Sequence, residues 1–523
     1  MEPSGGCGGE DRLSALPDDI LVLILHRIET LAAVQTSILS RRWSRVWALL
    51  PELHFHFAPR PDRIRDALDA HGGALRVLSV DSKNASPESV AAWLPVAACR
   101  LSGDLDFRNQ LASGTQEDQW RAQRGAIELP CFESATVVKL DLGFLGLSVR
   151  PAGVFARLTE LYLRNVHFHV PCELGDAVSS PRCPCLQKLV VSDTWGLTKL
   201  EVNSESLLYM DLTSLGGFRR LFIVAPALRY LGVAGCFCHC DDPSAACISA
   251  PRVDWLEWMD LYDPSSVHLG EMEHVDWLET YQFSVYGLQS STRNHSSVWL
   301  LQLFEVVEIL VLTLVYEKAK CTLRRRDCPR RAAGNTATSE HEKLRLQLWR
   351  QAPECDSPAV LDNYQYLMDC ITMLPGTTIL HLKVIANGHA FGASLFHILR
   401  MCSGIGQLDL DLWPHSTEEQ TACPSGCICR QQAHWKTEEL QLNCLQEVEM
   451  TELVVNEHEV TLMKHLFNWA TVLKILRVTF HSSVTERKAK GFCQMLRSFS
   501  RPETCKEFYI RKGTDKVLYV PEE

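Results

Sequence analysis

No stretch of the 523-residue sequence approaches the roughly 18 consecutive apolar residues that a transmembrane helix requires. The start of the chain also lacks the charged segment, apolar run and small-residue cleavage site of a secretory signal. We therefore expect a soluble protein that has no membrane partner and stays inside the cell, in the cytoplasm, the nucleus or both.

Positive charge is also in short supply. The 52 lysine and arginine residues are outnumbered by 63 aspartate and glutamate residues, which gives a formal net charge of −11. Because nucleic-acid binding depends on contacts between basic side chains and phosphates, this balance argues against nucleic acid as the main partner. Cysteine, in contrast, is plentiful. The 21 cysteines are an odd number in a long chain without a secretory signal, so we expect reduced thiols and not a disulfide framework.

Catalytic signatures are missing as well. The sequence has no G-x-S-x-G nucleophile elbow, no Walker phosphate loop, no H-E-x-x-H motif and no dinucleotide-binding fingerprint. A cysteine nucleophile would need an activating environment, and no order of residues identifies one. We therefore predict that the protein is not an enzyme and has no cofactor.

The sequence does contain three predicted short helices, which follow a glycine-rich and flexible tail over residues 1–10. Pro17 suits the first helical position, where its missing N–H costs nothing. Thr30 can cap a second helix over residues 31–39, and Ser40 can cap a third. The apolar side chains exceed the single stripe that a surface helix needs, and so small a unit cannot bury them all. The excess must face the rest of the chain or another protein.

Residues 11–57 resemble the F-box of plant proteins. The segments that carry the resemblance are Leu16-Pro17-Asp18, Ile24-Leu25, T-S-I-L-S-R-R-W from Thr36 to Trp43, and Trp47. The resemblance implies docking on the Skp-like adaptor of a cullin-RING ubiquitin ligase. The residues expected to bind the adaptor, some of which must also form the unit's own core, are Leu16, Pro17, Ile20, Leu21, Ile24, Leu25, Leu39, Trp43 and Trp47. The alternative is a helical cap on the domain that follows.

From residue 74 to residue 415 the sequence repeats a Leu-x-x-Leu-x-Leu pattern, which is typical of short strands with one buried face. Equivalent positions fall at Leu140, Leu161 and Leu189, and then at steps of ten or eleven residues at 200, 210, 221 and 231. Periods of about 20–29 residues are typical of leucine-rich repeats. The steps of ten or eleven indicate that the convex side is also extended. We predict an α/β fold in which the F-box is followed by an irregular leucine-rich-repeat solenoid.

The segment over residues 435–511 alternates strands and helices. The predicted strands are 445–450, 473–480 and 506–510, and the predicted helices are 460–467 and 485–499. Trp435-Lys-Thr, L-Q-E-V-E from Leu445, E-H-E-V from Glu457 and N-W-A-T-V-L-K from Asn468 resemble the FBD region of plant F-box proteins. With the repeats, the chain resembles the large grass family of F-box, leucine-rich-repeat and FBD proteins. This region would then be an FBD-like cap on the array.

A basic segment over residues 317–358 interrupts the repeats and departs from that family. It contains Arg324 to Arg326 and Arg330-Arg331 among small and polar residues. We interpret it as a mobile, solvated insertion between two repeats. A nuclear-import or nucleic-acid-binding patch is the alternative interpretation.

Two cysteine clusters have metal-binding residue types. The first consists of Cys423, Cys427, Cys429 and His434, and the second of Cys236, Cys238, His239 and Cys240. Structural zinc is usually bound by two ligand pairs, so the C-x3-C-x-C spacing of the first cluster is unusual. In the second cluster the ligands would alternate between the two sides of an extended chain. We expect no metal, and the first cluster is the candidate if one is present.

The function that these features favour is a substrate-recognition subunit of an SCF-type (Skp, cullin and F-box) ubiquitin ligase. The F-box would dock on the adaptor, and the repeats would present an unknown protein target. Catalysis would then come from holding that target near a ubiquitin-loaded enzyme. One alternative is an interaction scaffold that does not use the adaptor. Another is a nucleic-acid-binding protein that acts through the loop from Arg324 to Arg331.

Overall fold

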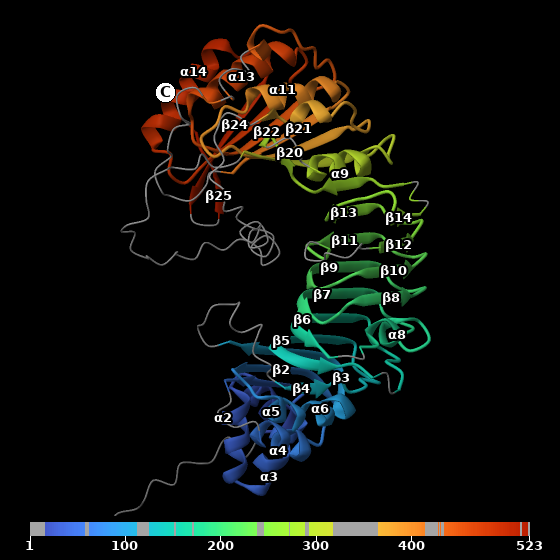
Figure 1. Ribbon diagram of the computed structural model, residues 1–523. Coiled ribbons are helices and arrows are strands. Elements are labelled where there is room, and N and C mark those ends of the chain that lie inside the picture. Colours follow the sequence, from blue (N-terminus) through green and yellow to red (C-terminus); the bar gives the residue numbers. More distant parts are fainter. Residues whose placement is uncertain are drawn as a thin grey trace, which may run out of the picture. The chain divides into compact units, whose positions relative to one another are not determined.

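The chain forms two compact units in a computed structural model (Figure 1). The residues that it describes are 16–57, 62–111, 125–150, 153–169, 172–237, 245–270, 272, 274–287, 292–316, 365–413, 427, 429, 434–512 and 515–520. Unit 1 comprises Met1–Leu231, His239–Arg252 and His268–Met272, and unit 2 comprises Gly232–Cys238, Val253–Val267 and Glu273–Glu523. The predicted tail and the basic insertion lie outside the described residues. No helix within the described ranges is long and apolar enough to cross a membrane.

Unit 1 begins with short helices. They are α1 (Asp18–Leu25), α2 (Thr30–Gln35), η1 (Thr36–Ile38), α3 (Arg41–Val46) and η2 (Trp47–Leu49). The predicted Ser40 cap is confirmed, because its Oγ accepts the N–H of Trp43 at 3.4 Å. The predicted Thr30 cap is wrong: Glu29 occupies the capping position, and Thr30 Oγ1 instead accepts the N–H of His54 at 2.7 Å. Pro17 precedes α1 as its N-cap residue.

The helical segment is joined to a parallel sheet. The strands of this sheet, in spatial order, are β1 (Glu52–His56), β2 (Leu75–Lys83), β3 (Leu101–Gln110), β5 (Val137–Ser148), β6 (Glu160–Phe168), β7 (Lys188–Trp195) and β9 (Tyr209–Gly216). Strands β1 and β6 bury largely alternate residues, as the Leu-x-x-Leu-x-Leu pattern predicts, whereas β7 buries a continuous run from Leu189 to Ser192. Leu161 lies opposite Val138 and not opposite Leu140. Our pairing of Leu140 with Leu161 was therefore two residues out of register, because a period of two cannot distinguish successive inward positions.

The segments between successive strands of the first sheet form a second parallel sheet. Its strands in unit 1 include β8 (Lys199–Asn203), β10 (Arg220–Val224) and β12 (Ala245–Ser249). Leu200 lies opposite Leu221 in this sheet, whereas Leu189 lies opposite Met210 in the first. The steps of ten and eleven residues thus alternate between two sheets, which confirms that the intervening segments are extended at these positions.

Three strands of the first sheet bend at the same place. Asn165, Asp193 and Ser214 have φ values of 51°, 53° and 56°, and the ladder pairs on either side skip them. Asparagine and aspartate adopt this left-handed conformation more readily than most residues. The polar residues in β6, β7 and β9 therefore allow aligned bulges.

Unit 2 contains a second series of strands. They are β13 (Trp255–Met259), β15 (Trp277–Thr280), β18 (Ile309–Val315), β20 (Ile379–Ile385), β21 (Gln407–Leu412), β22 (Glu447–Leu453), β23 (Ile475–Phe480) and β24 (Cys505–Lys512), each parallel to the next, with β25 (Asp515–Leu518) antiparallel to β24. The main helices are α9 (Thr292–Leu301), α11 (Gly392–Met401), α13 (Glu457–Trp469) and α14 (Glu486–Phe499). Figure 1 shows α11, α13 and α14 on one side of strands β20 to β24.

The remaining elements are short. They are α4 (Asp62–Ala70), α5 (Pro87–Ala91), α6 (Leu94–Arg100), α8 (Leu174–Val178), β4 (Ala126–Glu128), β11 (Tyr230–Ala234), β14 (Val267–Leu269), β16 (Phe283–Ser284), β17 (Tyr286–Gly287), β19 (Gln365–Tyr366), η4 (Met368–Cys370) and η5 (His434–Lys436).

The strands and helices predicted between residues 445 and 510 are present, although β25 was not predicted. Helix α9 runs from Thr292 to Leu301 and begins with polar residues. Its polar first half is partly buried: Asn294 donates to the Ser284 carbonyl at 2.9 Å and accepts the Ser284 N–H at 3.0 Å. Apolar periodicity cannot show a helix face that is buried through hydrogen bonds.

Candidate functional site

The N-terminal helices leave many large apolar side chains in water. We call these residues the exposed apolar set, which consists of Ile20, Leu23, Ile24, Ile28, Ile38, Leu39 and Leu49. The side chains of Ile38 and Leu39 are 85% and 69% exposed. Single exposed apolar residues are ordinary, but seven within some thirty residues indicate an interaction surface.

The structure divides the nine residues predicted to bind an adaptor. Pro17, Ile20, Ile24 and Leu39 are exposed and Leu16 is half-buried. The four that are buried are Leu21, Leu25, Trp43 and Trp47. These four belong to the core, as the sequence analysis expected for some of the nine, and they support the exposed residues from within.

The sequence analysis missed four members of the exposed apolar set. They are Leu23, Ile28, Ile38 and Leu49. Residues three or four apart share a helix face, so Leu21 and Leu25 mark one stripe of α1 and Ile20, Leu23 and Ile24 mark another. That second stripe was the signal that could have identified Leu23.

Arg42 connects the start of α1 to α3. Its Nε donates to the Asp18 carboxylate at 2.7 Å, and its Nη2 donates to the carbonyl of Leu16. An exposed ion pair of this kind contributes little to stability. Its effect is to fix where Leu16 and Pro17 lie relative to α3.

One face of the first sheet in unit 1 carries a tyrosine–lysine row, which consists of Lys139, Tyr162, Lys188, Tyr209 and Tyr230. The rings of Tyr209 and Tyr230 stack with centroids 4.1 Å apart. The Lys188 ammonium lies 4.1 Å from the Tyr209 centroid, and that of Lys139 lies 5.1 Å from the Tyr162 centroid. Partly exposed aromatic rings with cations over them offer both apolar and polar contacts to a protein partner.

Carboxyl groups lie beside this row. Burial raises the pKa of Asp193 to about 6, and the negative charge of Asp141 adds to that effect. Burial also raises the pKa of Asp141, although Asn165 opposes the shift by donating to its carboxylate at 2.8 Å. The two raised pKa values have burial as their main cause.

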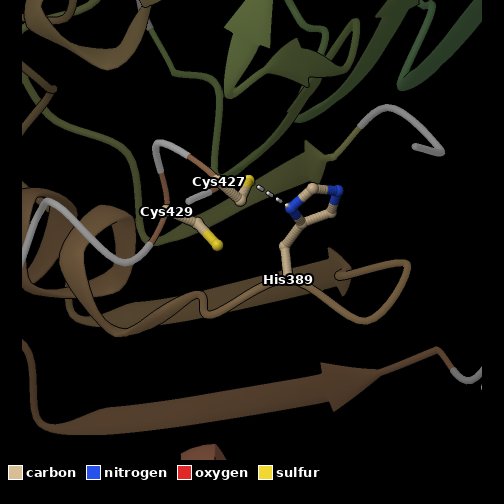
Figure 2. A group of neighbouring side chains, drawn as sticks. All are labelled: His389, Cys427 and Cys429. Carbon is tan, nitrogen blue, oxygen red and sulfur yellow. Dashed lines mark hydrogen bonds between the residues drawn. The ribbon is translucent and has the colours of Figure 1, made fainter. Parts of the chain in front are cut away.

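Part of the first cysteine cluster comes together in unit 2, with a different histidine. Figure 2 shows the side chains of His389, Cys427 and Cys429 pointing toward one another. Their ligand atoms all lie within 4.8 Å of one another, and Cys427 Sγ lies 3.4 Å from His389 Nδ1. His434 is not part of this group. Cys423 lies outside the described residues.

In the second cluster, Cys238, His239 and Cys240 lie outside the described residues. The backbone N–H of the fourth member, Cys236, donates to the Asp260 carboxylate at 2.8 Å. Nothing in the described part of the chain brings this cluster together as a metal site.

Comparison with known proteins now bears on these features. Residues 13–55 match the F-box domain. Among curated proteins, the chain is 28% identical over 273 residues to a putative F-box/FBD/LRR-repeat protein of Arabidopsis thaliana, covering 49% of this chain and 53% of the relative. It is 31% identical over 258 residues to an F-box/FBD/LRR-repeat protein of the same plant, covering 43% and 54%. It is 32% identical over 241 residues to an Arabidopsis thaliana FBD-associated F-box protein, covering 42% and 55%. The chain therefore contains an F-box domain and is similar over about half of its length to plant F-box/FBD/LRR-repeat proteins.

The match to the F-box domain covers every residue of the exposed apolar set, and Arg42 as well. The chain spans about half the length of the curated relatives that it matches. The mixed α/β composition of the structure, with helices first and a strand-rich remainder, agrees with the predicted class.

Proposed function

We propose that this F-box protein is the substrate-recognition subunit of an SCF-type ubiquitin ligase, is not itself catalytic, and works in the cytoplasm, the nucleus or both. The observation that carries the proposal is the exposed apolar set within the segment that matches the F-box domain. Catalysis in the complex would follow from proximity, because a bound target is held at high effective concentration near the ubiquitin-loaded enzyme.

Docking on a Skp-like adaptor would bury the exposed apolar set. Each large apolar side chain that leaves water contributes roughly 1.5–3 kcal/mol before the cost of association is subtracted. Ile38 and Leu39 would contribute the most buried apolar surface, since they are the most exposed of the set. Leu21, Leu25 and Trp43 support them from the core.

The target would bind to the sheet face of a leucine-rich-repeat solenoid, at the tyrosine–lysine row. The parallel strands and their aligned leucines support a repeat architecture, in which side chains on the open face vary while those on the inner face remain apolar. In this proposal the FBD-like region over 435–511 covers the last strands of the array, since a solenoid needs a capping unit.

Adaptor binding tests the first part of the proposal. The full chain is incubated with a purified Skp-like adaptor, and affinity is measured for wild type and for the double variant Ile38→Asp/Leu39→Asp. Two charges placed in a dry interface should weaken binding by roughly 100-fold or more, which corresponds to about 2.7 kcal/mol. The variant should fold normally because both side chains are exposed.

The matched control is Val472→Asp, at an apolar residue that is 41% exposed in the FBD-like region. It should leave adaptor affinity unchanged. Wild-type chain that does not bind the adaptor, or a Leu16→Ala/Pro17→Ala variant and the double variant that both bind as wild type does, would support the scaffold alternative instead.

Proximity labelling under proteasome inhibition tests the second part. Proteins enriched with wild type should be lost with Lys188→Glu/Tyr209→Ala, which disrupts the tyrosine–lysine row, while the adaptor is still captured. An unchanged set of labelled proteins would remove the row from the proposal. Enrichment of nucleic-acid-bound proteins that disappears on deleting residues 317–358 would favour the nucleic-acid alternative.

A further inference from the structure

We propose that His389, Cys427 and Cys429 form a zinc-binding site in unit 2. The proposal does not depend on ligase function. It replaces the sequence-based candidate, in which His434 was the histidine ligand, with a group that the tertiary structure brings together.

The first argument is the geometry of the donor atoms. A tetrahedral zinc ion with Zn–S bonds of about 2.3 Å and a Zn–N bond of about 2.05 Å holds sulfur and nitrogen about 3.6 Å apart. Cys427 Sγ and His389 Nδ1 are 3.4 Å apart, and all three ligand atoms lie within 4.8 Å of one another. An ion therefore requires only small movements of the side chains.

The second argument is that the backbone fixes His389 in place. The His389 N–H donates to the Ala386 carbonyl at 2.8 Å, which closes a tight turn. Asn387 and Gly388 occupy the two central positions with φ values of 47° and 80°, a turn that this residue pair forms readily. The turn connects β20 to α11, so the imidazole is anchored on two elements of regular structure.

The third argument is the aromatic surroundings of the imidazole. The His389 ring stacks on the Tyr316 ring, with centroids 5.8 Å apart and an angle of 21° between planes, and Tyr286 lies 6.3 Å away. The exposed fractions of His389, Cys427 and Cys429 are only 5–8%. Well-shielded thiols beside an oriented imidazole resemble the environment of bound zinc more than that of surface cysteines.

The donor types select the metal. Thiolate and imidazole ligands bind zinc and copper(I) well, whereas magnesium and calcium prefer oxygen. Two thiolates and a neutral imidazole bring a charge of −2, which balances Zn²⁺. Three protein ligands leave a fourth position for a solvent molecule.

The ion would link parts of the chain that are about 40 residues apart. His389 follows β20, whereas Cys427 and Cys429 lie between β21 and η5. Because a metal ion would close a long stretch of chain between its ligands, binding should stabilise unit 2 and protect it from proteolysis.

Metal content and proteolysis of the full chain test the site. Wild type purified without chelators should contain one zinc ion per chain by mass spectrometry. His389→Ala and Cys429→Ser should each reduce that content at least tenfold, while His389→Cys, which keeps a ligand, should retain zinc. Cobalt(II) substitution should give the intense visible absorption of a tetrahedral site and a thiolate charge-transfer band. Cleavage of unit 2 should accelerate in the two ligand variants and on chelation.

Two controls distinguish this site from other thiols. Cys444→Ser removes an exposed cysteine of the same unit, and His434→Ala removes the histidine of the sequence-based candidate. Both should retain zinc. Folded wild type without stoichiometric zinc, zinc retained by both ligand variants, zinc lost from His434→Ala alone, or a disulfide between Cys427 and Cys429 in the purified chain would overturn the proposal. Loss of adaptor binding with zinc content unchanged would instead concern the proposed function.

Discussion

The N-terminal helices and the FBD-like helices use similar amphipathic sequences in opposite ways. In α13 and α14 no large apolar side chain is exposed, and aromatic rings join the two helices: the ring centroids of Phe467 in α13 and Phe499 in α14 are 5.9 Å apart. In α1, η1 and η2 the large apolar residues are divided between core and solvent. Helices that exist only to complete a fold bury their whole stripe, so an exposed stripe indicates a partner.

Replacing a buried tryptophan in either region should have the largest effect on local stability. Trp43 and Trp469 are both buried, and replacing either by alanine should cost roughly 3–5 kcal/mol of local stability. Hydrogen exchange should show lost protection in α3 for Trp43→Ala and in α13 for Trp469→Ala. Only Trp43→Ala should also weaken adaptor binding. Equal weakening by Trp469→Ala would mean that the two regions are not functionally separate.

The second-largest effect should come from a buried carboxyl group of the FBD-like region, Glu459. Burial raises the pKa of Glu459 from 4.5 to about 7. The carboxyl group of the unfolded chain therefore loses its proton at lower pH than that of the folded chain. As pH rises from about 4.5 to about 7, the free energy of unfolding should fall by on the order of 3 kcal/mol, and above that range it should stay constant.

Glu459→Gln should remove that dependence while preserving the cap on α13, because glutamine can also accept the Asn456 N–H. The measurement is hydrogen exchange of α13 across this pH range in both proteins. The described residues 16–57 contain no buried carboxyl group, so α1 to α3 should show no difference between the two. A parallel pH response in both proteins would show that Glu459 ionises as an exposed residue does.

The helix caps should give the smallest effects. Asn456 Oδ1 accepts the Glu459 N–H at 2.9 Å within a complete capping box, whereas Ser40 Oγ accepts the Trp43 N–H at 3.4 Å. Asn456→Ala should cost about 1 kcal/mol and Ser40→Ala about 0.5 kcal/mol, measured as local unfolding free energies. Ser40→Asp, which keeps an acceptor, is the control for the weaker cap. A larger loss for Ser40→Ala than for Asn456→Ala would contradict the ranking by hydrogen-bond length.

Much of the fold could be predicted because its signals are local. The strands from β5 to β11 coincide with leucine patterns, and the elements between residues 445 and 510 coincide with changes between periods of two and of 3.6 residues. Prediction failed where a partner outside the pattern decided the outcome. Thr30 accepts a hydrogen bond from His54 of β1 instead of capping α2.

The candidate site was predicted in the same partial way. The resemblance identified the N-terminal segment, and the F-box match agrees. It could not separate Leu21, which is buried, from Ile20, which is exposed, because both are apolar and adjacent on α1. Which face of a short helix meets the protein core depends on the elements packed against it.

The sequence by itself determined the F-box domain, the positions of many strands and the presence of surplus apolar surface, because each depends on residues close together in the chain. Only the tertiary structure decided which apolar residues remain in water and which histidine joins Cys427 and Cys429. His434 is near those cysteines in sequence, yet His389 is the one that meets them. The physical reason is that parallel strands return the chain to the same edge of a sheet, and so bring together residues that no local pattern connects.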